Sequence, residues 1–416
     1  MFRKRILILF FFAATFCRSQ NNNSALLQTL LKEQSGIVKK VWQQAKKFRI
    51  QIIYTQINRD KLNRPSFITH TFEADSNNYF YCASLVKLPV SILALQKLNE
   101  LNIPGLNKDT RMTTDSVIPC HKKVHQDTSS LNGFPSIGQY IRRMLLVSDN
   151  GAYGRVYEFV SPDYIHGELM KKGYPDVHIL NRYDGGCKES DHLYTNPINF
   201  YDEKNTVIFS QPGIQGKNVS KISSKKFLIG KAWLNNSGKK FNEPKDFSNY
   251  NFMTLRGTHE LLKNLVFQPY SPSNNNFEIT ASDRRFLLNY MCLYPRESHS
   301  PRYNSKDYYD SYKKYLIYGN NKNEITDTTV RIFNIVGQSY GFLSDCAYII
   351  DFKNKIEFLL SAVIYVNEDE IINDGKYEYR SIGLPYLSEL GKIILEYDRK
   401  RKREFTPNLN EFRNLD

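Results

Sequence analysis

Ser84 and Lys87 lie three residues apart at the start of a strongly apolar stretch, in the motif S-L-V-K. If a helix begins here, their side chains share one face, one turn apart. A serine hydroxyl is a weak nucleophile because its proton must be removed, and a lysine whose pKa is lowered by burial or by other cations can accept that proton. The pair therefore predicts acyl transfer through Ser84, although S-x-x-K also occurs by chance at exposed helix starts.

Two further motifs could complete such a site. Ser148-Asp149-Asn150 follows a predicted helix, where Ser148 could relay a proton to a leaving nitrogen and Asn150 could hold a substrate amide. Asp149 would fix the turn by accepting backbone N–H bonds. Gly337 lies between two predicted strands, where a glycine lets a substrate pack against an edge strand. Read singly, these are an ordinary helix end and an ordinary hairpin.

The elements that must position these motifs lie at both ends of the chain and between them. Helical spacing predicts a helix over 26–48, a buried helix over 85–101 loosened or kinked at Pro89, helices over 135–147, 152–159 and 163–172, and a last helix over 385–405. Thr258 and Ser282-Asp283 are predicted to cap two more. Strands are predicted over 50–56, 67–72, 329–336, 342–352 and 356–366. This order predicts an α+β fold: one antiparallel sheet built from both termini, flanked by the terminal helices, with a helical lobe inserted.

The N-terminus predicts export. A basic start, an apolar run over 6–16 and a polar exit form a signal peptide over 1–19, with a membrane anchor as the alternative. Phe16 disfavours a lipoprotein site at Cys17. The remainder, 20–416, is expected to form one domain, with its sheet lobe over about 25–80 and 328–405 and its helical lobe and insertions over about 84–327.

The amino-acid composition limits the classes of partner that this protein could bind. The 416 residues are 41% hydrophobic and 13% aromatic, which excludes general disorder. The net charge of +15 could favour nucleic acid or anionic envelope polymers, and export argues against nucleic acid. The basic run over 399–403 is interpreted as a solvated helix end. We expect a soluble monomer after signal cleavage.

Cysteine and histidine usage predicts neither a disulfide framework nor a metal site. Beyond Cys17 the cysteines are odd in number and widely spaced: Cys82, Cys120, Cys187, Cys292 and Cys346. His121 and His125 are four residues apart, as helical metal ligands would be, but no third ligand is near in the sequence. No metal and no cofactor are therefore expected.

Taken together, the motifs resemble those of the penicillin-recognising serine hydrolases, and of class A β-lactamases most closely. That family carries S-x-x-K, S-D-N and K-T-G in this order. Here the first two match fully, at Ser84 and Ser148, and Ile335-Val336-Gly337 matches the third only in its glycine. The resemblance covers most of the chain outside about 200–327 and implies a β-lactamase/transpeptidase-like fold.

The resemblance also assigns roles. It implies that Ser84 attacks the carbonyl, Lys87 takes the proton, Ser148 protonates the leaving nitrogen and Asn150 positions the acyl side chain. The oxyanion hole would consist of the amides of Ser84 and of a residue after Gly337, taken here as Ser339.

Two departures bear on turnover. Ile335 replaces the family lysine that binds the substrate carboxylate, so Lys322, Arg331 or a residue of the insertion over about 200–327 would have to supply the charge. The glutamate that assists deacylation corresponds to Asp184, which is one methylene shorter and could otherwise be a turn-forming Asp-Gly pair.

The expected function is that of an exported, periplasmic class A-type β-lactamase acting on β-lactams or peptidoglycan-like peptides. One alternative is a penicillin-binding or D-alanyl peptidase-like enzyme, or a hydrolase of other amides or esters. Another is a non-catalytic binding protein, because the K-T-G lysine is Ile335.

Overall fold

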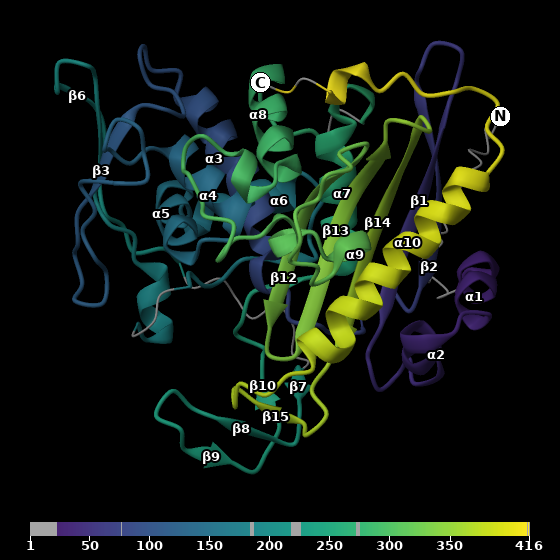
Figure 1. Cartoon of the computed structure of the whole chain (residues 1–416). Coiled ribbons are helices and arrows are strands. Elements are labelled where there is room, and N and C mark those ends of the chain that lie inside the picture. The colour runs from purple at the N-terminus through teal and green to yellow at the C-terminus, as the bar shows by residue number, and fades with distance from the viewer. Residues whose placement is uncertain are drawn as a thin grey trace, which may run out of the picture.

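The computed structural model describes residues 23–75, 77–183, 187–217, 226–271, 275–413 and 415. Its centre is a five-stranded antiparallel sheet in the order β12-β13-β14-β1-β2 (Figure 1). These strands are β1 (Gln51–Arg59), β2 (Pro65–Phe72), β12 (Val330–Ser339), β13 (Phe342–Asp351) and β14 (Ile356–Tyr365). β1 pairs with β14, so the two ends of the chain build one sheet and the predicted α+β fold is confirmed.

Both faces of the sheet are covered, which explains why its strands are so apolar. In β13, Cys346 and Tyr348 belong to one core, while Ala347 and Ile349 belong to the other, as the two-residue alternation of a strand requires. One face packs against α1 (Ala25–Lys32), α2 (Gly36–Gln43) and α10 (Leu384–Lys400), the last of which crosses the sheet diagonally in Figure 1. The other face packs against α7 (Leu255–Val266) and α8 (Ala281–Cys292).

The helical lobe lies beyond β12 and consists mainly of α3 (Lys87–Leu101), α4 (Ile137–Val147), α5 (Asn150–Val160) and α6 (Pro162–Lys171) (Figure 1). The smaller elements are β3 (Arg111–Thr114), β4 (Val177–His178), β5 (Ile198–Tyr201), β6 (Val207–Gln211), β7 (Leu228–Ile229), β8 (Ala232–Leu234), β9 (Lys240–Phe241), β10 (Lys245–Asp246), β11 (Phe252–Met253), α9 (Tyr315–Tyr318) and β15 (Ile371–Ile372). Within the described ranges, no helix combines the length and apolarity that a membrane crossing would need.

Several predicted boundaries need correction. The single helix predicted over 26–48 is two helices, because the chain turns before Gly36, whose φ of 61° is the left-handed conformation that glycine favours. Thr254 and Thr280, rather than the predicted Thr258 and Ser282-Asp283, cap α7 and α8 with their side chains. Each accepts a backbone N–H three residues on, which satisfies a group that has no partner inside the helix.

The loosening predicted at Pro89 is found just before it. Residues Ala83–Val86 form a 3₁₀ turn, η1, and α3 begins at Lys87. Pro89 therefore lies in the first turn of α3, where a missing N–H leaves no helical hydrogen bond unmade. This arrangement sets the geometry of the residues around Ser84.

Candidate active site

Ser84 lies within the 3₁₀ turn η1 and Lys87 directly follows it, so the two side chains face each other. Side chains three residues apart eclipse in such a turn, and Lys87 Nζ lies 2.9 Å from Ser84 Oγ. Ala83, directly before the serine, has a φ of 45°, a conformation that costs energy for a residue with a side chain. Ser84 is half-buried, while Lys87 has no exposed surface. The predicted pair thus exists as a contact beneath the surface.

The second motif brings the other polar groups to the same amine. Lys87 Nζ lies 2.9 Å from Ser148 Oγ, 2.6 Å from the Ser148 carbonyl oxygen and 2.7 Å from Asn150 Oδ1. With Ser84 Oγ this makes four oxygens around one nitrogen, and two of them are serine hydroxyls that can donate as well as accept. The lone pair of a neutral amine could therefore accept the hydrogen of a serine hydroxyl here.

Asp149 holds this motif in place, as the sequence predicted. Ser148 follows the end of α4 in a left-handed conformation, with a φ of 61°. Asp149 accepts a 2.9 Å bond from the Ala152 N–H at the start of α5 and a 2.7 Å bond from Arg143 Nη2. The turn is therefore fixed by a charge-assisted cap rather than by packing alone.

Electrostatics favours the neutral form of Lys87. Burial lowers its pKa well below the ordinary value, and the cation of Lys313 lowers it further. Asp149 opposes this shift, but its carboxylate is engaged by Arg143 and by the backbone of α5. Both effects favour the neutral amine, which is the form that can act as a base.

The third motif packs β12 against the turn that carries the serine. A Cβ added to Gly337 would lie 2.5 Å from the Cys82 carbonyl oxygen and 2.6 Å from Ser344 Oγ, so only glycine fits. Gln338, and not the predicted Ser339, lines the cavity beside Ser84. Ser339 lies one position further along β12, opposite Phe342.

Gly337→Ala is expected to lower the rate of Ser84 acylation by about 10²-fold, because displacing η1 by a fraction of an ångström misaligns the nucleophile. The rate of adduct formation followed by intact mass checks this. The matched control is Gly167→Ala in α6, where nothing lies within 4 Å of an added Cβ. Equal rates in the two variants would contradict the close fit.

A cavity of about 650 Å³ opens over Ser84, a size suited to a small organic substrate. Its wall contains Ser148, Asn150 and Gln338, together with a tyrosine-rich side formed by Tyr309, Tyr312, Tyr315, Tyr377 and Tyr379. Lys313 and Arg380 line it as well, and none of the described residues that line it is acidic.

The structure shows where each cation that could replace the K-T-G lysine lies. Ile335 is fully buried in the core between β12 and the helical lobe. Arg331 pairs with Glu297, at 2.8 Å, and Lys322 is exposed over the Tyr309 ring. Lys313 lies at the cavity instead, and the sequence signalled it only as one of two adjacent lysines in the insertion.

The loop expected to carry the deacylation base approaches the site through its tyrosine. The Tyr183 hydroxyl donates to the Ala83 carbonyl, and Lys87 Nζ lies 5.7 Å from the centre of the Tyr183 ring. Arg182, directly before it, forms a buried ion pair with Glu158 of α5. Asp184 lies outside the described residues. The sequence motif contained Tyr183 but gave no sign of its contact with Ala83.

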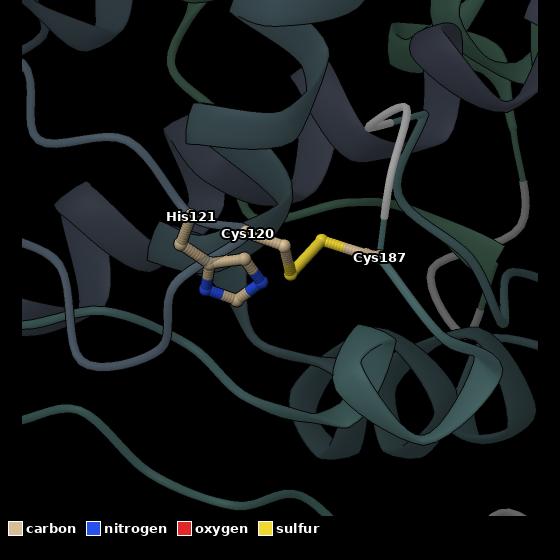
Figure 2. Close-up of side chains that lie close together, drawn as sticks. All are labelled: Cys120, His121 and Cys187. Atoms are coloured by element: carbon tan, nitrogen blue, oxygen red, sulfur yellow. A yellow bond between two sulfur atoms is a disulfide. The ribbon is translucent and has the colours of Figure 1, made fainter.

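A disulfide that the sequence did not predict joins Cys120 to Cys187, just beyond this loop (Figure 2). The two cysteines are 67 residues apart in the chain, and only the fold brings their Cα atoms to 5.3 Å. An odd number of cysteines does not exclude a single bond, and the other three cysteines among the described residues are buried free thiols. His121 lies beside the disulfide, but disulfide sulfurs are not the thiolates that bind metals. The exposed His125 contacts Asp115 instead, at 2.7 Å.

Removing this disulfide by a Cys120→Ser, Cys187→Ser double substitution is expected to destabilise the protein by about 2–4 kcal/mol, because the bond closes a long loop in the unfolded chain. Urea unfolding with and without a reductant measures the effect. In the double variant the reductant should change nothing, whereas it should lower the midpoint of the parent protein. A midpoint insensitive to reductant in both proteins would show that the bond is absent.

Comparison with known proteins found one matching family model and several similar solved structures. The model of the beta-lactamase enzyme family matches residues 36–224. Among solved structures, the chain is similar to a β-lactamase from Sphaerobacter thermophilus (10% identity, TM-score 0.45, covering 85% of this chain and 95% of that one). It is also similar to a class A β-lactamase from Clostridium kluyveri (12%, 0.43, 86% and 97%) and to a mutant of PBP-A solved as an acyl-enzyme complex with penicillin G (12%, 0.47, 90% and 98%).

A search of curated proteins found no matching sequence. The matched region contains Lys87 and the three side chains that meet at its amine, in the order S-x-x-K and S-D-N. The family match over residues 36–224 and these contacts support a penicillin-recognising serine hydrolase superfamily for this chain.

Proposed function

We propose that this protein is an exported serine hydrolase of the class A β-lactamase type, which opens β-lactam amides through an acyl-enzyme on Ser84. The observation that carries the proposal is the contact of a buried, low-pKa Lys87 with both Ser84 Oγ and Ser148 Oγ. A nucleophile, a base and a proton relay within hydrogen-bonding distance of one another are what acyl transfer requires.

In the proposed reaction the neutral amine of Lys87 removes the proton of Ser84 as Oγ forms its bond to the lactam carbonyl carbon. The amide of Ser84 and that of the β12 residue after Gly337 would hold the oxyanion, and the position of Gln338 in the cavity favours it over Ser339 for this role. When the C–N bond breaks, the proton passes from Lys87 through the Ser148 hydroxyl to the nitrogen. Asn150, which also contacts Lys87, would hold the acyl side chain.

Release of the product requires water and a base. The β-lactamase and the peptidase-like alternatives differ in whether such a base is present. If Asp184 serves as that base, the protein is a β-lactamase. If it does not, the acyl-enzyme persists, as in a penicillin-binding or D-alanyl peptidase-like enzyme, a reading favoured by Ile335 at the K-T-G position. A third candidate, a binding protein without catalysis, rests on the same replacement.

The intact mass of the protein after incubation with a panel of β-lactams tests the proposal. Sustained hydrolysis of a chromogenic cephalosporin, with an adduct that forms and decays, is the expected result. A single stable adduct without turnover would favour the peptidase-like reading. No adduct with any β-lactam or acyl phosphonate would exclude both enzyme readings.

Export is part of the proposal. The predicted signal peptide lies outside the described residues, and the Cys120–Cys187 disulfide supports an oxidising compartment. The mass of the protein recovered from a periplasmic extract should correspond to cleavage near Ser19 or Gln20.

A further inference from the structure

Lys313 is almost completely buried, but it also lines the cavity over Ser84, where a ligand could contact it. It ends the short turn η6 (Asp310–Lys313), and Asn334 Nδ2 donates a 2.6 Å bond to its carbonyl, which fastens this turn to β12. Its surface is only 5% exposed, and it lines the same cavity as Ser84. The cation is thus held beside the nucleophile by a strand that carries no lysine of its own.

The ammonium of Lys313 is poorly partnered. Among the described residues its one hydrogen-bond acceptor is the Met144 carbonyl oxygen, at a long 3.4 Å. Its neighbour Lys314 is equally buried, yet it donates to the Met291 and Ile332 carbonyls and to Asn334 Oδ1. A buried cation with one weak acceptor is costly unless a ligand completes its coordination.

The surroundings specify the charge of that ligand. The described lining of the cavity contains no acidic side chain, and a second cation, Arg380, lies exposed at its edge. Asp345 contacts Asn334 and the Leu316 N–H and is fully buried, so it cannot enter the cavity as a counter-ion. An anionic group on the substrate would supply the missing partner.

We propose that Lys313 binds the carboxylate of the substrate, with Arg380 as a second cation at the cavity edge. This assignment rests on the proposed function and names the residue that selects anionic substrates. It places the anion-binding charge on η6, whereas β12 contributes Ile335 at the position where a lysine was expected.

Anion binding at this position should be linked to proton uptake. Burial, and then the cation of Lys314, lower the pKa of Lys313 to about 7, and Asp345 opposes this shift. At pH 8 much of Lys313 is therefore neutral before binding, and a bound carboxylate would restore its proton. The restored positive charge on Lys313 would in turn favour neutral Lys87, because two nearby ammonium groups repel each other.

The test crosses one substrate change with one protein change. Acylation of Ser84 by benzylpenicillin and by its uncharged methyl ester is measured in the parent protein and in Lys313→Met. We expect the parent to prefer the carboxylate by about 10- to 100-fold, the range of a charged hydrogen bond, and Lys313→Met to lose most of that preference while still reacting with the ester. Lys313→Arg should recover part of it.

Controls separate this role from folding and from general charge. Lys322→Met removes a lysine of the same insertion that is exposed, and it should keep the preference for the carboxylate. Lys313→Met should melt at the same temperature as the parent or higher, because a lysine whose pKa falls on folding disfavours the folded state at every pH below its unfolded pKa.

An unchanged preference in Lys313→Met, or an equal loss with both compounds, would overturn the assignment. If the parent forms no adduct with either compound, the proposed function fails by itself. Calorimetric binding of the two compounds to Ser84→Ala, with and without Lys313→Met, then still decides the carboxylate site. Proton uptake at pH 8, measured in two buffers of different ionisation enthalpy, should disappear in Lys313→Met.

Discussion

Ser84→Ala is expected to form no covalent adduct with any β-lactam and to lose at least about 10³-fold in any hydrolysis of a chromogenic cephalosporin. The bond to the carbonyl carbon is made by Ser84 Oγ, and no neighbouring group replaces an absent nucleophile. Lys87 cannot compensate, because its nitrogen lies beneath the surface among the oxygens of three side chains and a backbone carbonyl. Intact mass and steady-state hydrolysis measure the two effects.

The matched control for this prediction is Ser381→Ala. Ser381 is an exposed serine that lines the same cavity, and it should be acylated neither before nor after substitution of Ser84. Peptide mapping of the parent adduct should place the added mass on the peptide that contains Ser84. An adduct that survives in Ser84→Ala would show that another residue is the nucleophile.

Lys87→Met should slow acylation by about 10²- to 10⁴-fold, the usual contribution of a general base. The pH dependence gives the sharper readout. A base acts in its neutral form, so the acylation rate of the parent should fall as pH drops through the pKa of Lys87 and stay level above it. Because burial and the cation of Lys313 hold that pKa well below the ordinary value, the fall in rate should lie at lower pH than an ordinary lysine would give. Lys87→Met should lose this acidic limb.

Lys97→Met is the control for the lysine prediction. Lys97 belongs to the same helix and burial lowers its pKa to about 8, but it donates to the Phe159 carbonyl and to Gln211, away from Ser84. Its replacement should leave the position of the acidic limb unchanged. Lys313→Met, by contrast, should move the limb to higher pH, because one of the cations that disfavours protonated Lys87 is gone. A parent profile without an acidic limb would contradict Lys87 as the base.

Local spacing was enough to predict the central contact of the site. Ser84 and Lys87 are three residues apart, and Ser148 and Asn150 flank one turn, so short-range geometry fixes each pair. The sheet was predictable for a similar reason, because β12, β13 and β14 are continuous apolar runs separated by short turns. The prediction that the two motifs form one site depended on their joint resemblance to a known family.

Other residues of the site could not be found this way, because tertiary structure alone brings them together. Lys313 reaches the cavity through the bond from Asn334, and Cys120 meets Cys187 across two loops. Neither contact corresponds to a characteristic spacing of residues in the sequence. Gln338, rather than Ser339, lines the cavity, and the identity of the second oxyanion-hole amide stays a prediction.

The pairing of β1 with β14 determines when, during synthesis of the chain, the central sheet and the candidate site can form. β1 can pair with β2 early, but its second partner is present only when Val363 and the rest of β14 have been synthesised. The turn that carries Ser84 packs against Gly337 of β12, which also belongs to this last portion of the chain. The whole helical lobe is therefore synthesised before Ser84 has this support. Completion of the candidate site is accordingly a late event in the synthesis of the chain, because η1 meets Gly337 only after β12 has been made.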